Sequence, residues 1–266
     1  MYVLTSPAYN PGFFSVFNSV LGSLHFYELE QWQGLEVDFQ DRGLYYDKKY
    51  GPNWWSYYFE PLGLTKNSCD ECKKFPTYKK IIFALVSQFE ITREEGKRLI
   101  DQYIRIKPNI QEKINIFMHE HDFKNFYMIG IHYRGTDKVN EAPAVSYEEA
   151  IESIKKVIEV NASKPTKIFI ATDDGIFLKE ATQQFPTKVC AIDTIRSENG
   201  KPPHITNRTE NYKKGQDALI DCFLLSQCNI LIKCASNLSD CSMKFNPTIP
   251  VIHLSNSFAQ KAVQYD

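Results

Sequence analysis

The residues best suited to chemistry lie in one short stretch, residues 127–141, which reads Tyr-Met-Ile-Gly-Ile-His-Tyr-Arg-Gly-Thr-Asp-Lys-Val-Asn-Glu. An apolar run ends there in a cluster of acidic and basic side chains, namely His132, Arg134, Asp137, Lys138 and Glu141. Arginine suits an anionic ligand because its guanidinium donates paired hydrogen bonds, and carboxylates and imidazoles suit proton transfer. A solvated loop with surface ion pairs is the competing interpretation of the same spacing.

The apolar run predicts a buried strand that holds this cluster at its C-terminal end. From residue 123 onward the sequence predicts strands at 127–132, 167–171, 188–192, 229–234 and 251–254. Between them it predicts a helix after the capping box Ser146-x-x-Glu149, and further helices at 175–185, 216–227 and 236–245. Such alternation indicates a parallel, doubly wound sheet, in which ligands bind beyond the C-terminal ends of the strands.

Three motifs carry a resemblance to a known family. Residues 132–139 with Glu141 resemble the H-x-R-x-T-D-K-V motif of the GDP-fucose-dependent α1,6-fucosyltransferases, including the nodulation-type bacterial enzymes. Residues 168–174, which read Ile-Phe-Ile-Ala-Thr-Asp-Asp, are similar to the second family motif. Residues 207–211 and 221–227, leading to Ala-Ser-Asn at 235–237, resemble the third. The order of the motifs is that of the family, and the match covers the C-terminal half of the chain.

The resemblance implies the GT-B class of α/β fold, with two Rossmann-like halves facing a cleft. We expect an acceptor-side domain at residues 1–122 and a nucleotide-sugar-binding domain at residues 123–266. The chain departs from the eukaryotic enzymes at Gly135, where they carry a second Arg, and at Asn237, where they carry a second Ser.

The resemblance also implies an activity, that of an inverting glycosyltransferase. It would transfer L-fucose from GDP-fucose, or a sugar from a related GDP-sugar, to a hydroxyl of a glycan or glycoconjugate acceptor. Arg134 would bind the diphosphate, and His132 and Asp221 would hold the guanine and ribose side. By family position the full donor site comprises His132, Arg134, Asp173, Asp174, Arg208, Asp221, Ser236 and Asn237.

Proton transfer from the acceptor needs a base on the side away from GDP. The family places its base at the position of Glu141, although the alignment requires a gap of one residue in this loop. Asp137 is the competing base, and Lys138 would tune whichever carboxylate acts. We expect no divalent metal and no cofactor, because the arginine and a helix N-terminus already neutralise the diphosphate.

The N-terminal half offers weaker signals. A strand at residues 2–5, a loop with Gly12 and a helix from Phe13 form an arrangement that receives phosphate or sugar, although a plain turn fits equally. Residues 32–59 contain all three Trp and many Tyr, which indicates irregular structure around a partly apolar cleft as well as ordinary core. Residues 78–89 predict a buried helix, and helices are also expected from Thr92 and Pro108.

Composition limits the partners and the location. The chain has 266 residues, a formal net charge of -1 and no Lys/Arg block, so we expect no nucleic acid and a small anionic ligand. No apolar segment is long enough for a membrane span, and the first residues do not resemble a signal peptide. Seven cysteines, mostly in apolar segments, favour a cytoplasmic location, with a lumenal protein cut from its anchor as the alternative. A lone C-x-x-C at residues 69–72 makes zinc only a minor alternative.

Two other functions fit parts of the sequence. A non-catalytic nucleotide-sugar-binding protein, serving as a sensor or scaffold, would use the same pocket, but it would need neither Lys138 nor Glu141. A Rossmann-type oxidoreductase or a P-loop enzyme is disfavoured, because no strand is followed by G-x-G-x-x-G and no G-x-x-x-x-G-K-S/T is present.

Overall fold

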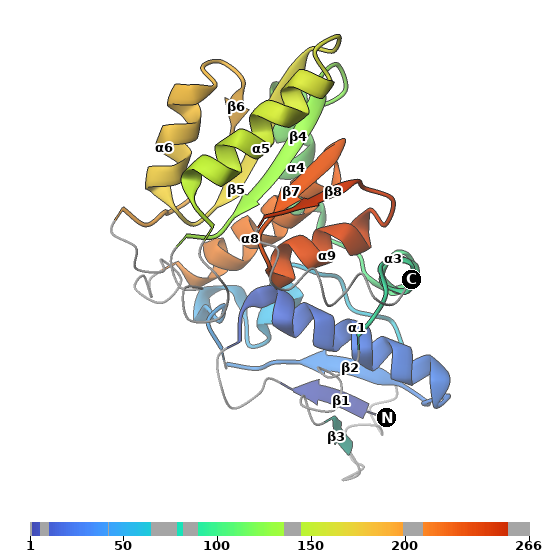
Figure 1. The fold of residues 1–266 in the computed structure, drawn as a ribbon. Coiled ribbons are helices and arrows are strands. Elements are labelled where there is room, and N and C mark those ends of the chain that lie inside the picture. Colours follow the sequence, from blue (N-terminus) through green and yellow to red (C-terminus); the bar gives the residue numbers. More distant parts are fainter. Residues whose placement is uncertain are drawn as a thin grey trace. The chain divides into compact units, whose positions relative to one another are not determined.

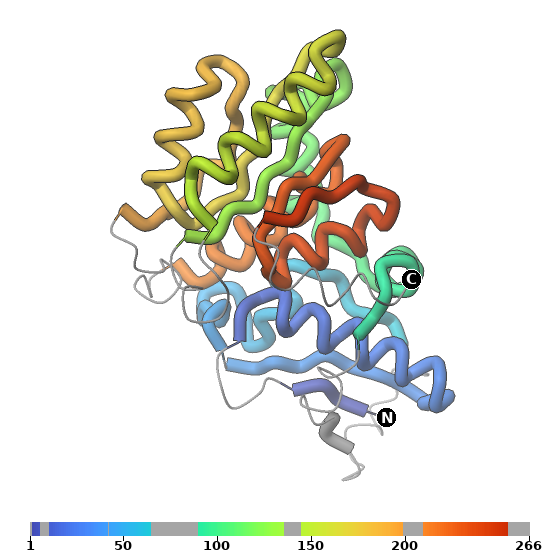
Figure 2. The backbone as a smooth tube through the Cα atoms, viewed as in Figure 1, coloured from blue at the N-terminus to red at the C-terminus, as the bar shows by residue number. Residues whose placement is uncertain are grey.

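A computed structural model describes residues 2–5, 11–41, 43–64, 79–81, 90–135, 145–198 and 210–254. Contacts divide the chain into two compact units. Unit 1 is Met1–Gln111 with Thr209–Gln216, and unit 2 is Glu112–Arg208 with Asp217–Asp266. The backbone can be followed by its colour in Figure 2. Each unit contains a parallel sheet of its own.

Unit 1 is built on a three-stranded parallel sheet with the strand order β2-β1-β3. The strands are β1 (Tyr2–Thr5), β2 (Leu35–Asp38) and β3 (Lys79–Ile81). The described part of unit 1 also contains helices α1 (Phe13–Leu29) and α3 (Arg93–Tyr103), which Figure 1 shows. Two short 3-10 helices, η1 (Lys48–Tyr50) and η2 (Trp54–Tyr57), follow strand β2.

Two expectations for unit 1 are corrected. The segment 78–89 was expected to be a helix, but residues 79–81 form a strand that pairs with β1, and residues 82–89 lie outside the described residues. A short apolar run has no periodicity that separates a helix from a buried strand, which explains the error. The aromatic segment 32–59 was expected to be irregular, but it contains strand β2. The burial of Trp54, Trp55 and Tyr58 agrees with the expectation that part of this segment is ordinary core.

Unit 2 is built on a five-stranded parallel sheet with the strand order β6-β5-β4-β7-β8. Its strands are β4 (Tyr127–Tyr133), β5 (Thr166–Thr172), β6 (Val189–Cys190), β7 (Ile230–Lys233) and β8 (Val251–His253). Its helices are α5 (Tyr147–Val160), α6 (Gly175–Gln184) and α9 (Asn237–Phe245). Helices α4 (Pro108–Glu120) and α8 (Asn211–Ser226) each begin in unit 1 and continue into unit 2.

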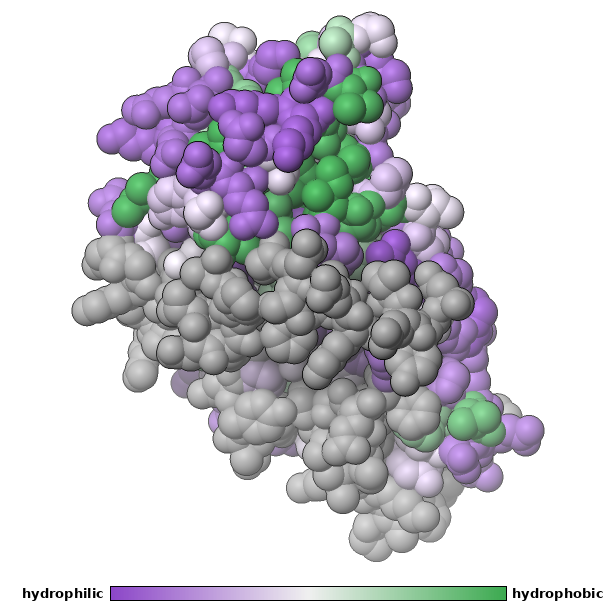
Figure 3. All heavy atoms as spheres, viewed as in Figure 1, coloured by the Kyte–Doolittle hydropathy of each residue, from purple (hydrophilic) through white to green (hydrophobic). Residues whose placement is uncertain are grey.

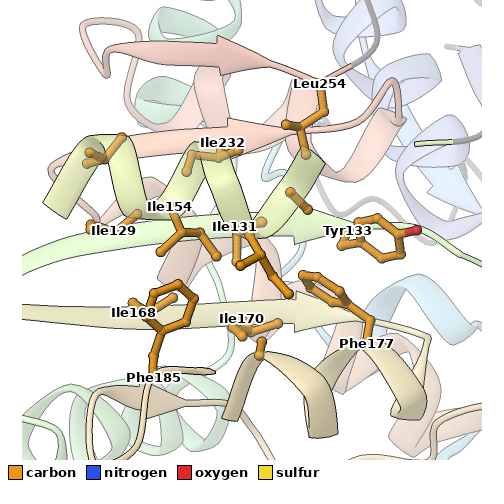
Figure 4. Packing of buried hydrophobic residues seen from close by; sticks show 14 of the residues in the cluster. Ile129, Ile131, Tyr133, Ile154, Ile168, Ile170, Phe177, Phe185, Ile232 and Leu254 are labelled. Carbon is orange, nitrogen blue, oxygen red and sulfur yellow. The ribbon is translucent and has the colours of Figure 1, made fainter. Parts of the chain in front are cut away.

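One face of this sheet is covered by α5 and α6. Ile131, Ile170 and Ile232, from the three central strands, point to this face and pack against Ile154 of α5 and Phe177 of α6 (Figure 4). The exposed residues of α5 are mainly Glu and Lys. Figure 3 shows hydrophilic residues over much of the coloured part of the face in view, with hydrophobic residues between them. This division of α5 into a buried apolar side and a polar side is the amphipathic pattern that its sequence predicts.

The opposite face of the sheet packs on α4 and α8. Phe117 of α4 lies 5.6 Å from Phe169 of β5, measured between ring centroids. A Cβ atom at Gly130 of β4 would lie 2.9 Å from Sγ of Cys228, just beyond α8. A glycine in the middle of this strand therefore lets the end of α8 approach the sheet backbone closely.

The sequence predictions for unit 2 are confirmed in element order and type. Ser146 accepts a hydrogen bond from the backbone N–H of Glu149, as its capping box predicts. Two boundaries differ, because α8 begins at Asn211 and β6 is only two residues long. None of the helices in the described part of the chain has both the length and the apolar character needed to cross a bilayer.

Candidate functional site

The strand order of unit 2 indicates where its ligand site lies. The chain runs outward from β4 to β5 and β6 on one side, and it then returns to place β7 on the other side of β4. The order of strands therefore reverses between β4 and β7, and ligands of doubly wound sheets bind beyond the C-terminal ends of the strands at such a point. Arg134 follows β4 and Ser236 follows β7, so both residues lie at this edge.

Arg134 is held by the end of the neighbouring strand β5. Its Nε atom lies 3.7 Å from Oδ2 of Asp173, and the two side chains are 25% and 21% exposed. The other oxygen of Asp173, Oδ1, accepts a hydrogen bond of 3.2 Å from the backbone N–H of Gly135. Asp173 thus restrains both the guanidinium and the backbone that follows it, while Arg134 stays partly open to solvent.

Asp174, the next residue, is buried and its two carboxylate oxygens accept hydrogen bonds within the protein. Oδ1 caps helix α6 by accepting from the backbone N–H groups of Ile176 at 2.9 Å and Phe177 at 3.1 Å. Oδ2 accepts from the hydroxyl of Tyr147 at 2.6 Å. Burial, followed by this hydrogen bond to the carboxylate, raises the pKa of Tyr147 above its ordinary value. These contacts give Asp174 a structural part in shaping the strand end.

His132 and Asp221 lie on the side of the sheet away from α5 and α6. His132 is buried, and it alternates in β4 with Ile131 and Tyr133, which point to the α5 face. Asp221 is also buried, and it precedes Leu225 by one turn of α8. Because Leu225 faces Gly130 of β4, Asp221 lies on the helix face that is turned toward the sheet.

A buried lysine lies beside His132. Lys233 of β7 is the register partner of His132, and its side chain is 3% exposed. Its Nζ atom forms an ion pair with Oδ1 of Asp240, in the first turn of α9. A carboxylate so close to a helix N-terminus would repel an anion, and the lysine offsets its charge.

Ser236 is the N-cap of α9. Its hydroxyl oxygen accepts from the backbone N–H of Leu238 at 3.4 Å, and the exposed Asn237 begins the helix. The backbone N–H of Cys234 donates to the carbonyl of His132 at 3.1 Å, which joins the end of β7 to the end of β4. The first turn of α9 therefore begins next to the segment that carries Arg134, with backbone N–H groups that no intrahelical carbonyl accepts.

The remaining sequence candidates are divided between unit 1 and residues that are not described. Gly12, in unit 1, is the N-cap of α1, and the N–H of Phe13 donates to the hydroxyl of Tyr45 at 2.8 Å. Asp137, Lys138, Glu141 and Arg208 lie outside the described residues. The residues that are described include no group of three or more His, Cys, Asp or Glu able to hold a metal ion.

Sequence reasoning missed several residues at this edge, namely Tyr147, Arg196, Lys233 and Asp240. Lys233 gave the clearest signal, because a lysine inside an apolar strand is rarely buried without a partner. Tyr147 gave no signal, since its contact with Asp174 joins segments 27 residues apart.

The two parallel sheets and the strand-end site define an α/β protein with the GT-B type of fold. The family model for Nodulation protein Z (NodZ) matches residues 86–255, which is more than half of the chain. The chain therefore belongs to the NodZ family.

Individual relatives agree with this membership. The chain is 26% identical over 181 residues to Nodulation protein Z of Bradyrhizobium diazoefficiens, a match that covers 65% of this chain and 45% of that protein. It thus spans about half the length of this curated relative.

Solved structures share the fold. A NodZ alpha-1,6-fucosyltransferase co-crystallised with GDP is 19% identical, with a TM-score of 0.63, covering 96% of this chain and 95% of that chain. The fucosyltransferase NodZ from Bradyrhizobium is 18% identical, with a TM-score of 0.61 and coverage of 95% and 94%. POFUT1 in its apo form is 10% identical, with a TM-score of 0.56 and coverage of 96% and 98%. At such identities the likeness establishes the fold.

Proposed function

We propose that this chain is an inverting glycosyltransferase that transfers L-fucose from GDP-fucose to a hydroxyl of a carbohydrate acceptor. The observation that carries the proposal is Arg134, a partly exposed guanidinium fixed by Asp173 where the strand order of unit 2 reverses. Membership of the NodZ family supports the proposal, and so do the GDP and GDP-fucose complexes of the similar NodZ structures.

The reaction places two demands on the protein, and the first concerns the leaving group. As the bond from the sugar to the diphosphate breaks, negative charge grows on GDP. Arg134 is suited to bind it because a guanidinium pairs with two phosphate oxygens and does not lose its proton. The first turn of α9, at Ser236 and Asn237, would add backbone donors, and Lys233 offsets the adjacent Asp240.

The rest of the donor would be held by the other residues of this edge. His132 and Asp221 are assigned to the ribose and guanine, Asp173 to the orientation of Arg134, and Asp174 to the shape of the strand end. By its position in the family motif, Arg208 is assigned to the donor as well. Gly12 is assigned to a second phosphate or sugar contact in unit 1. We assign the donor to residues 123–266 and the acceptor to residues 1–122.

The second demand is removal of the acceptor proton. Glu141 is the proposed base, with Asp137 as its competitor and Lys138 as the cation that tunes the acting carboxylate. Inversion follows when the hydroxyl attacks the anomeric carbon from the face opposite GDP. No divalent metal is required in this scheme. We also propose a cytoplasmic location, supported by five buried cysteines that form no disulfide, namely Cys190, Cys222, Cys228, Cys234 and Cys241.

The proposal is tested by titrating the purified chain with GDP, GDP-fucose, GDP-mannose, UDP and ADP in a calorimeter. GDP release from the two GDP-sugars is then followed with water as the acceptor. Binding confined to guanine nucleotides, with release of GDP from GDP-fucose, is the expected result. Guanine binding without any release would instead favour a non-catalytic sensor or scaffold, and equal binding of UDP would contradict the donor assignment.

A further inference from the structure

Arg196 is a charged group that the donor assignments above leave unused. It lies between β6 and α8 in sequence, and its guanidinium is half buried. Nη1 donates to the carbonyl of Thr194 at 3.3 Å and Nη2 to the carbonyl of Ile192 at 2.7 Å. Its Nε atom is buried and finds no hydrogen-bond partner among the described residues. The cation is thus held by the backbone of its own segment, and none of its described hydrogen bonds reaches a carboxylate.

The segment around Arg196 is fixed at both ends within unit 2. The backbone N–H of Ser197 donates to the carbonyl of Asp173 at 2.8 Å, and the carbonyl of Ser197 accepts from the N–H of Gly175 at 2.8 Å. On the other side the hydroxyl of Thr194 donates to Oδ2 of Asp217, on α8, at 2.6 Å. Arg196 therefore lies in a connecting segment, residues 194–197, that runs between the end of β5 and the side of α8. We call this segment the strap.

The side of α8 that meets this strap also carries Asp221. Asp217 and Asp221 are four residues apart, so they lie on the same face of the helix. Burial lowers the pKa of Arg196, and the charges of Asp221, Asp193 and Asp217 oppose this effect, with Asp221 the largest of the three. The half-buried guanidinium of Arg196 and the buried carboxylate of Asp221 are therefore electrostatic neighbours.

We propose that Arg196 is a positioning residue that keeps the carboxylate of Asp221 ionised and turned toward the nucleobase, and so determines the preference for guanine. This inference rests on the proposed function, because it takes Asp221 as the residue that binds the base. A buried carboxylate is costly unless a nearby cation offsets its lost hydration. A guanidinium held by backbone carbonyls supplies that charge without covering the carboxylate with its own hydrogen bonds.

The chemistry of guanine explains why such a carboxylate matters. Guanine presents its N1–H and its 2-amino group side by side as hydrogen-bond donors, and an ionised carboxylate can accept from both. Hypoxanthine lacks the 2-amino group but is otherwise the same base. The ratio of the affinities for GDP and IDP, the inosine nucleotide, therefore measures the second of these hydrogen bonds and leaves the diphosphate contacts unchanged.

The test measures the dissociation constants of GDP and IDP for the full chain and four variants by calorimetry. The variants are Asp221→Asn, Arg196→Gln, Arg196→Lys and Thr194→Val. We expect the wild type to prefer GDP by at least about tenfold, the scale of one hydrogen bond to a charged group. Arg196→Gln should lower this ratio to near that of Asp221→Asn, because GDP loses the charge-assisted hydrogen bonds from N1–H and the 2-amino group, whereas IDP loses only the one from N1–H. Arg196→Lys should restore part of the ratio, because it keeps the charge but not the planar fork.

Thr194→Val is the matched control for the strap, because it removes the bond to Asp217 but keeps the charge of Arg196 and the two backbone carbonyls that hold its guanidinium. Its GDP to IDP ratio should equal that of the wild type. Equal losses of GDP and IDP affinity in Arg196→Gln would overturn the proposal, since they would mean that Arg196 only supports the strap. If Arg196→Gln does not fold, Arg196→Lys provides the test. The proposal is then overturned if Arg196→Lys keeps the wild-type ratio of GDP to IDP affinity while it binds both nucleotides more weakly.

Failure of this inference differs from failure of the proposed function. If Asp221→Asn abolishes the ratio and Arg196→Gln preserves it, the function stands and the inference is wrong. If the wild type binds no guanine nucleotide, both are wrong. A double variant, Arg196→Gln with Asp221→Asn, should have the same ratio as Asp221→Asn alone, because the arginine acts through the aspartate.

Discussion

A Cβ atom at Gly135 would lie 2.2 Å from Oδ2 of Asp174, far inside van der Waals contact. The same oxygen accepts the hydrogen bond from Tyr147, and the other oxygen of Asp174 caps α6. The aspartate is buried and short, so it has little freedom to move away. Any side chain at position 135 therefore requires Asp174 to shift from its place.

We expect Gly135→Ala to lower the free energy of unfolding by about 1 to 3 kcal/mol, the usual cost of overpacking. The reason is that the methyl group must displace Asp174 from Tyr147 or from the start of α6. Denaturant unfolding monitored by circular dichroism measures the change. Gly12→Ala is the matched control for stability, because no atom lies within 4 Å of a Cβ there and its φ of −63° suits alanine. Equal stability of both variants would show that Asp174 adapts freely.

Stability should also fall in acid through Glu95, on α3 in unit 1. The hydrogen bond from Arg98 is the largest cause that lowers the pKa of Glu95 from 4.5 to about 2, and burial opposes it. His25 also contacts this carboxylate, with its Nδ1 atom 3.0 Å from Oε1. Because the folded-state pKa lies below the unfolded one, the stabilisation is complete above about pH 4.5 and disappears between about pH 4.5 and 2.

Arg98→Met should therefore flatten the dependence of unfolding free energy on pH across this window. After allowance for solvent screening, we expect the difference in unfolding free energy between pH 6 and pH 2 to be smaller in Arg98→Met than in the wild type by about 1 to 2 kcal/mol. Urea unfolding at half-unit pH intervals measures it. Arg93→Met, at the start of the same helix, serves as the control for a lost surface charge. Parallel curves for the wild type and Arg98→Met would contradict the account of this ion-pair group.

Turnover should proceed fully in excess EDTA. In the proposed scheme, Arg134 and the first turn of α9 would supply the positive potential that a bound metal would otherwise provide to the leaving diphosphate. GDP release from GDP-fucose, measured with EDTA and again after adding manganese or magnesium, tests this expectation. Activity that is lost in EDTA and recovered with metal would require a metal site in the donor pocket.

The base is tested with Glu141→Gln and Asp137→Asn. Loss of a general base should lower kcat by about 10² to 10⁴ without weakening donor binding. We expect this result for Glu141→Gln, measured as turnover beside calorimetric GDP affinity. A nearly wild-type rate for Glu141→Gln, together with an inactive Asp137→Asn that still binds GDP, would assign the base to Asp137.

The sequence predicted the alternating half of the fold well because its signals are local. The capping box at Ser146 and the apolar run of residues 127–132 each specify an element without reference to distant residues, and both are confirmed. Strand β3 was missed because its identity depends on pairing with β1, which lies far away in sequence. The sequence predicted that helix α8 begins at residue 216, whereas it begins at Asn211. Its first turns belong to unit 1, and the local apolar pattern does not indicate contacts with that unit.

The candidate site was predictable only in part, for a similar physical reason. Arg134 and Asp173 each follow an apolar run that predicts a strand. Because parallel strands end at the same edge of a sheet, the sequence predicts that these two residues lie close together. The position of Arg196 depends on the strap, which runs from the end of β5 to α8. No residue spacing in the sequence predicts this connection. Likewise, the close approach of Asp174 to Gly135 appears only in the folded structure, because the two residues are far apart in the sequence.

The central claim is that Arg134 binds the diphosphate of a GDP-sugar, and calorimetric titration of Arg134→Ala with GDP and with guanosine tests it most directly. Loss of a paired contact to phosphate should cost about 2 to 4 kcal/mol, or roughly 30- to 1000-fold in GDP affinity. Guanosine has no phosphate, so its affinity should stay within about threefold of the wild type. Arg98→Met, which removes an arginine in unit 1, should bind both ligands normally. GDP affinity of Arg134→Ala within twofold of the wild type would contradict the account.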